Sequence, residues 1–183
     1  SPLPPLPDPG GESPAPTTTA AATTTAAPTT TAAPTTTVAP TTTTAAPTTT
    51  AAPTWQAEML AALNAARAGV GAAPLSICGN LVDAAVAHSR DQAEHRTMSH
   101  HGSDGSTMVQ RAERAGYGHW SNLGETVAYA YGSVASDMSA WMNSSGHRAN
   151  ILSSSFVHVG LGRATAANGA PYWTQDFGRG GAC

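Results

Sequence analysis

Proline is concentrated in the first third of the chain, and this distribution limits the possible folds more than any other feature. Residues 1–54 contain 12 of the 14 prolines, only two charged residues, Asp8 and Glu12, and no aromatic residue. A segment of this composition cannot bury enough apolar surface to offset the entropy that is lost on ordering it. We therefore expect residues 1–54 to be disordered and residues 55–183 to form a single domain.

The proline-rich segment carries a short repeat. Pro28, Pro34 and Pro40 are six positions apart, and Thr triplets separate them. Such Thr- and Pro-rich sequences are extended and typical of O-glycosylated stalks, although an unmodified linker would have the same composition. Because the chain begins at Ser1 rather than at methionine, we also expect a secretion signal to have been removed. The protein is then extracellular, either free or associated with the cell surface or cell wall.

The two cysteines, Cys78 and Cys183, are 105 positions apart. A disulfide between them would fit an extracellular protein and would fix the C-terminal end of the domain. In the chain-entropy model it would stabilise the fold by about 4–5 kcal/mol. Two free thiols are the alternative.

The charge pattern excludes some partners. All eight basic residues are Arg, and they form no stripe or cluster of positive charge. We therefore expect no nucleic-acid partner and no electrostatic docking on an anionic membrane. No stretch approaches the roughly 20 apolar residues of a transmembrane helix.

Helical spacing of apolar residues predicts four helices in the domain. The first begins after Thr54, and the second begins after Asn80, each of these residues acting as the N-cap. Ser106 or Thr107 can cap a short third helix, and the fourth covers residues 136–143.

The period then changes to two, which indicates strands. Residues 157–162 alternate between apolar and small or polar side chains, and Asn168–Gly169 is a strong hairpin signal before a return strand at 172–177. A further strand is expected at 126–131. Helices followed by an antiparallel hairpin indicate a layered α+β domain.

Three polar clusters fall on segments that we expect to be loops, at residues 98–105, 123–126 and 144–152. Two imidazoles and a carboxylate among them can bind a divalent metal or act as general acid–base groups. Their separations of 25 and 22 positions, between His100, Glu125 and His147, follow no local rule for metal ligands. The HExxH, P-loop, GxGxxG and GxSxG motifs are absent, which disfavours zincins, nucleotide-binding proteins and ordinary serine hydrolases.

Taken in order, the segments of the domain resemble the CAP superfamily of cysteine-rich secretory proteins, antigen 5 and plant pathogenesis-related proteins, and within it the bacterial-type SCP-like branch. The resemblance covers almost the whole of residues 55–183. It rests on Leu63-Asn64-Ala65-Ala66-Arg67, Pro74-Leu75, residues 81–89, Met98–Gly105, Ala115-Gly116-Tyr117, Gly124-Glu125, Trp141-Met142-Asn143-Ser144, Gly146–Leu152, Val159-Gly160-Leu161-Gly162 and residues 172–178.

This resemblance implies an α-β-α sandwich with a central antiparallel sheet and a cleft that holds two histidines and acidic residues. Matched motif by motif, it implies His100, Glu125 and His147 as ligands of zinc or another divalent cation. Ser144 stands where relatives carry a second glutamate, and its hydroxyl would bond a metal-bound water.

Two further histidines are expected to have structural surroundings. His88 falls on the apolar side of the second helix, so we expect a buried, hydrogen-bonded imidazole. His158 alternates with the apolar residues of its strand, so we expect it to face solvent.

The resemblance implies no general enzymatic reaction, and three functional hypotheses remain open. The first is a secreted monomeric binding module that takes a sterol or fatty-acid ligand, or an extracellular protein partner, at the His/Glu cleft. The second is a stalked surface adhesin or antigen. The third is a metal-dependent hydrolase in which His100 and His147 hold the ion and Glu125 activates water.

Overall fold

A computed structural model describes residues 54–183 of the chain. The disorder and glycosylation expected for residues 1–53 lie outside the described residues. The elements run in the order α1 (Trp55–Ala68), β1 (Ser76–Ile77), α2 (Gly79–His95), α3 (Met108–Arg114), β2 (Asn122–Tyr129), α4 (Val134–Asn143), α5 (Ser145–Leu152), β3 (His158–Thr165) and β4 (Pro171–Arg179).

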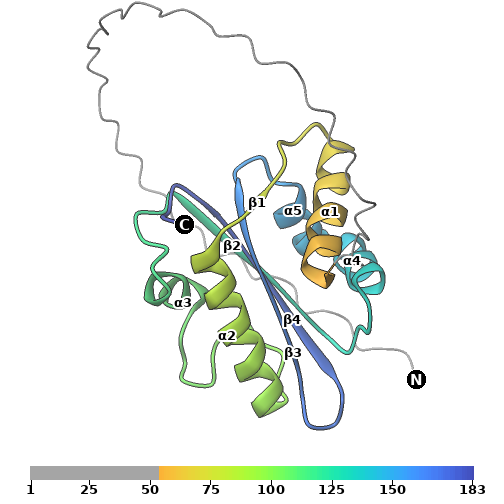
Figure 1. The fold of residues 1–183 in the computed structure, drawn as a ribbon, viewed down its shortest axis with the longest axis vertical. Helices are drawn as coiled ribbons and strands as arrows, with labels where there is room; N and C mark the ends of the chain where they lie inside the picture. The colour runs from red at the N-terminus through yellow and green to blue at the C-terminus, as the bar shows by residue number, and fades with distance from the viewer. Residues whose placement is uncertain (1–53) are drawn as a thin grey trace, which may run out of the picture. The chain divides into compact units, whose positions relative to one another are not determined.

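The four strands form one sheet in the order β1-β3-β4-β2. The pairs β3–β4 and β2–β4 are antiparallel, and the two residues of β1 add a short parallel pair at the edge of β3. Helices α2 and α3 lie on one side of the sheet, and α1, α4 and α5 lie on the other, as Figure 1 shows. The predicted α+β fold, an α-β-α sandwich with a mainly antiparallel sheet, is confirmed.

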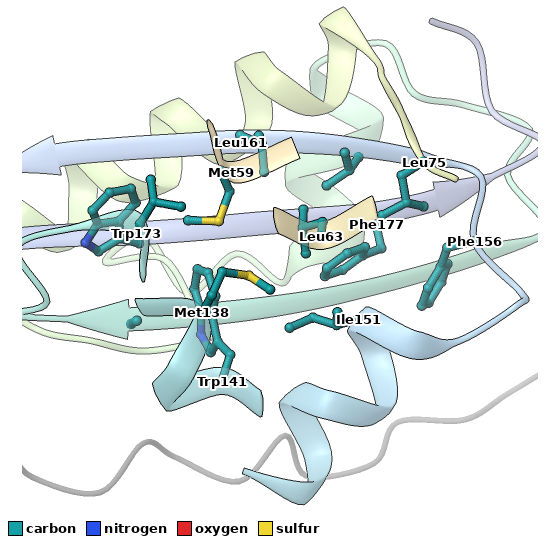
Figure 2. Close-up of a cluster of buried hydrophobic side chains, with 13 residues drawn as sticks. Met59, Leu63, Leu75, Met138, Trp141, Ile151, Phe156, Leu161, Trp173 and Phe177 are labelled. Atoms are coloured by element: carbon teal, nitrogen blue, oxygen red, sulfur yellow. The ribbon is translucent and has the colours of Figure 1, made fainter. Parts of the chain in front are cut away.

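The larger hydrophobic core fills the layer between the sheet and the group α1, α4 and α5 (Figure 2). Trp141 of α4 and Trp173 of β4 are buried there, and each indole N–H donates to a backbone carbonyl, at 3.1 Å to Val127 and 2.8 Å to Tyr131. The buried tryptophans therefore contribute apolar area without leaving a donor unpaired.

The opposite layer is held by an unusually close approach of α2 to β3. A Cβ atom on Gly160 would clash with the backbone of Leu81, and a Cβ atom on Gly162 would clash with the backbone of Ala85. The alternation of glycine with Val159 and Leu161 thus gives β3 one flat face for the helix and one apolar face for the core.

The local signals for helices and strands were mostly correct. Thr54 caps α1, Thr107 caps α3 in a capping box, and the hairpin turns at Gly169, whose φ is 84°. The cap expected for α2 was wrong: the helix begins at Gly79 after Cys78, and the Asn80 side chain donates to the carbonyl of Ala182 instead.

Two of the expected loops are regular elements. Residues 145–152 form α5, whose buried face is only His147 and Ile151, too small for an apolar period to be recognised. Arg67 of α1 is fully buried and holds the C-terminal end of α5 by donating to the carbonyls of Ile151 and Ser153 at 2.7 and 2.8 Å. Residues 123–126 belong to β2, with Glu125 buried in the strand.

The expected disulfide is present. Cys78 and Cys183 are bridged across 105 positions, and residues 54–183 contain no free cysteine.

Candidate functional site

The carboxylate of Glu125 is the centre of a buried polar cluster on the α2–α3 side of the sheet. His100 Nδ1 lies 2.8 Å from Oε1, and Arg111 Nη2 lies 2.5 Å from Oε2. His88 Nε2 lies 3.8 Å from Oε2. The side chain of Glu125 is only 3% exposed, whereas that of His100 is 27% exposed, so the imidazole lies between the buried carboxylate and the surface.

The segment that carries His100 is fixed by side chains of α2 and α3. Its neighbour Ser99 is held at both backbone atoms: His88 Nε2 lies 2.8 Å from the carbonyl oxygen, and Gln92 accepts from the amide at 3.2 Å. Arg111 also donates to the carbonyl of His100 at 3.1 Å. His88 is therefore the buried, hydrogen-bonded histidine expected from the sequence, and it positions the site.

A second buried acid lies beside Glu125. Asp176 of β4 is directly paired with Glu125 of β2, so the two side chains project from the same face of the sheet. Asp176 is fully buried, and its carboxyl hydrogen-bonds with the side chain of Glu125. Burial and the neighbouring charge of Glu125 raise the pKa of Asp176 well above its ordinary value, so its protonated form is favoured.

The pKa of Glu125 shifts in the opposite direction to that of Asp176. Burial opposes the charge of Glu125, but the hydrogen bond with His100 and the charge of Arg111 outweigh burial, and the pKa of Glu125 is lowered. Burial lowers the pKa of His88, which is therefore neutral at pH 7. The charge of the Glu125 carboxylate is compensated by Arg111.

One ring nitrogen of His100 could act as a metal ligand. Its Nδ1 is engaged by Glu125, while its Nε2 is buried and has no hydrogen-bond partner among the described residues. A histidine that is oriented by a carboxylate through one ring nitrogen and presents the other is the usual arrangement of a metal-binding imidazole. The chemistry of this donor therefore fits a divalent cation.

His147, the second expected histidine, is fully buried on α5. The helix is attached to β2 at the site itself, because Asn150 donates to the carbonyl of Glu125 at 3.0 Å. Ser144, at the junction of α4 and α5, is half-buried, and its side chain makes no capping hydrogen bond.

The structure brings His100 and Glu125 into contact, but the three expected metal ligands do not form one group. In the part of the chain that the structure describes, one group of three potential metal ligands has atoms within 4.8 Å of one another, and it consists of Cys78, His158 and Cys183. His100, Glu125 and His147 are not such a group.

Several residues of the cluster were not expected from the sequence. Arg111 belongs to a short helix with no motif, and Asp176 becomes a neighbour of Glu125 only through the strand register. His158 was expected to face solvent, but it is half-buried, and its Nδ1 lies 2.9 Å from the hydroxyl oxygen of Tyr117. That contact comes from a helix–strand connection 41 positions away, which strand alternation does not reveal.

The surface next to the site is polar. His101 is exposed beside His100, and an open pocket lies along α3 and the residues before it. The pocket is lined by Asp104, Gly105, Ser106, Gln110, Glu113 and Arg114. Within residues 54–183, no helix has both the length and the apolar content needed to span a membrane.

Comparison with known proteins finds relatives among bacterial sequences. The family model described as "Cysteine-rich secretory protein family" (CAP) matches residues 60–177. The "Uncharacterized protein YkwD" of Bacillus subtilis is 31% identical over 123 residues, which cover 67% of this chain and 46% of that protein. The chain thus spans less than half the length of this relative.

Solved structures show the same fold. An extracellular protein containing a SCP domain from Bacillus anthracis has 26% identity and a TM-score of 0.60, over 67% of this chain and 39% of that one. An outer surface protein of Borrelia burgdorferi has 19% identity and a TM-score of 0.64, over 68% of this chain and 92% of its own.

Proposed function

Because the chain belongs to the cysteine-rich secretory protein (CAP) family, we propose that it is a secreted, non-enzymatic binding domain that recognises an extracellular partner at the surface around His100. The extracellular SCP-domain relative supports secretion. The proline-rich segment would serve as the spacer that presents the domain.

The state of Glu125 is the observation that carries this proposal. A residue that activates water needs an accessible group with a pKa near the working pH. Glu125 is buried, both of its oxygens are engaged, and its pKa is lowered. Such a carboxylate is a weak base, and its place in the structure suits the orientation of His100. The hydrolase hypothesis therefore has little support.

The chemistry of the surface favours a polar partner over a lipid. A sterol or fatty acid needs an apolar cavity. The pocket beside the site is lined by charged, amide and hydroxyl side chains, and His101 adds a further polar group. We therefore favour a polar group of an extracellular protein as the ligand.

Binding of the fluorescently labelled full chain to the surface of the source organism's cells tests the proposal. We expect saturable binding that His100→Asn weakens at least about 10-fold, the effect of losing roughly 1.4 kcal/mol. His119→Asn is the matched control, because His119 is exposed and its φ of 59° suits asparagine. Absence of saturable binding, or equal losses in both variants, would refute the proposal; saturable uptake of labelled sterol or fatty acid would favour the lipid ligand instead.

A divalent cation at the same site is the second candidate, and it is favoured by the buried Nε2 of His100, which has no hydrogen-bond partner within residues 54–183. His100 and His147 would supply the imidazole ligands, and Glu125 would orient His100. Bound zinc would add a positive charge with which a partner's carboxylate could interact.

Calorimetric titration of zinc into the oxidised full chain at neutral pH tests this candidate. We expect one ion per chain and a loss of affinity of at least about 10-fold in His100→Asn and in His147→Asn, with His119→Asn unchanged. No detectable zinc binding by the wild-type chain would exclude it.

A further inference from the structure

A second cluster of metal-binding side chains lies away from Glu125, at the disulfide. Cys78 immediately precedes α2, and Cys183 follows β4. His158, the first residue of β3, lies beside both, and a ring nitrogen of His158 and the two sulfur atoms are within 4.8 Å of one another. The three residues come from segments that are far apart in sequence, so the fold alone brings them together.

The imidazole of His158 is held in place. Its Nδ1 lies 2.9 Å from the hydroxyl oxygen of Tyr117, and the two rings meet edge to face at 5.9 Å. Tyr117 is itself fully buried, against Gly178 and Gly181. Nδ1 is thus engaged by a rigid partner, as in histidines that bind a metal through the other ring nitrogen.

The C-terminal segment has anchors other than the disulfide. Asn80 donates to the carbonyl of Ala182 at 3.1 Å, and Gly181 lies so close to the ring of Tyr117 that a side chain there would clash. These contacts would keep Cys183 next to Cys78 after the bridge is opened.

We propose that reduction of the Cys78–Cys183 disulfide creates a zinc-type metal site formed by Cys78, Cys183 and His158. Two cysteine thiolates and one histidine are a common zinc ligand set, with water in the fourth position. Ligand atoms around zinc are separated by about 3.5–3.8 Å, as follows from Zn–S distances of ~2.3 Å and Zn–N distances of ~2.0 Å. The present spacing of at most 4.8 Å requires only a small adjustment once the sulfur atoms are free to separate.

Reduction of the Cys78–Cys183 disulfide balances in electrons and protons when a dithiol is the reductant. The dithiol gives two electrons and two protons to the S–S bond and becomes a disulfide, while Cys78 and Cys183 become thiols. Zinc then binds the two thiolates and the neutral imidazole, and the two thiol protons are released to water. The domain would thereby hold metal at this position only in its reduced state.

Cobalt(II) titration of the full chain is the direct test, because thiolate-to-cobalt charge-transfer absorption reports sulfur ligands and is blind to a site made of histidines alone. The chain is reduced with a water-soluble phosphine, separated from it without oxygen, and titrated beside the oxidised chain. We expect the absorption to appear at one cobalt per chain in the reduced form only, and zinc to remove it.

Three variants assign the ligands. We expect His158→Asn to weaken cobalt binding at least about 10-fold and Tyr117→Phe, which removes the hydrogen bond to His158, to weaken it about 10–100-fold. His119→Asn is the control and should bind as the wild type does.

Three results would overturn the inference. The first is no charge-transfer absorption in the reduced chain. The second is absorption of equal affinity in His158→Asn, which would indicate binding by the two thiols alone. The third is loss of the far-ultraviolet circular dichroism on reduction without recovery when zinc is added.

Discussion

At the scale of single residues, two neighbouring acids of the site have pKa values that shift in opposite directions. Glu125 keeps its charge because Arg111 and His100 contact it, whereas burial and the charge of Glu125 raise the pKa of Asp176 on the adjacent strand. The opposite shifts of the two pKa values favour one buried negative charge over two. This balance explains how a sheet can hold two carboxyl groups side by side in its interior.

The stability of the fold should depend on the ion pair between Arg111 and Glu125. In Arg111→Met the carboxylate stays buried without its cation, so we expect a loss of about 3–5 kcal/mol in the free energy of unfolding, measured with urea. Adding Glu125→Gln to this variant should restore at least about 1 kcal/mol, because the unpaired charge is removed. A single variant within about 1 kcal/mol of the wild type, or a double variant no more stable than the single one, would contradict this assignment.

Asp137 of α4 provides a pH-dependent prediction. It is fully buried without a hydrogen-bond partner in the described part of the chain, and burial raises its pKa from 3.8 to about 8. The unfolded chain releases this proton at lower pH than the folded chain does, so the group costs stability increasingly as pH rises from about 4 to about 8. Asp137→Asn removes this dependence. We expect the free energy of unfolding of the variant to rise relative to that of the wild type by up to about 4 kcal/mol between pH 4 and pH 7. Urea unfolding of both proteins at several pH values measures this difference. A difference that does not change with pH would contradict the prediction.

At the scale of elements, the contact of α2 with β3 positions the site. His88 and Gln92 of α2 hold Ser99, and through it His100, only because the helix lies directly on the glycine face of β3. The packing of α2 on β3 thus determines the position of His100.

Gly160→Ala tests this contact. The added methyl group would clash with backbone atoms of Leu81, which cannot move aside as a side chain can, so we expect a loss of about 1–3 kcal/mol or a failure to fold. Gly79→Ala is the matched control, since a Cβ there meets no atom within 4 Å and lies in the first turn of α2. Equal stability of the two variants in thermal unfolding would refute the close packing.

The elements also show which features a sequence can predict. Helix α1 and the β3–β4 hairpin carry their signals locally, in the cap Thr54 and the turn at Asn168–Gly169, and both were correctly predicted. Helix α5 was missed because distant contacts stabilise it, chiefly Arg67 from α1. The family resemblance implied His100, Glu125 and His147 as ligands in one cleft, but the hydrogen bond between His100 and Glu125 and the roles of Arg111 and Asp176 depend on tertiary neighbours and strand register.

At the scale of the whole molecule, the two layers have different tasks. The layer with α1, α4 and α5 holds the main apolar core, whereas the layer with α2 and α3 holds the polar cluster, the disulfide and His158. A domain that separates stability from chemistry in this way can vary its polar surface without losing its core. We propose that the proline-rich segment presents this polar surface to an extracellular partner.

We propose that Glu125 orients His100 for binding and does not activate water. Turnover of a peptide and ester library by the full chain, with zinc present, tests it most directly when the wild type and Glu125→Gln are compared. We expect no hydrolysis by the wild type above the rate of the variant. Hydrolysis by the wild type that Glu125→Gln abolishes would contradict it.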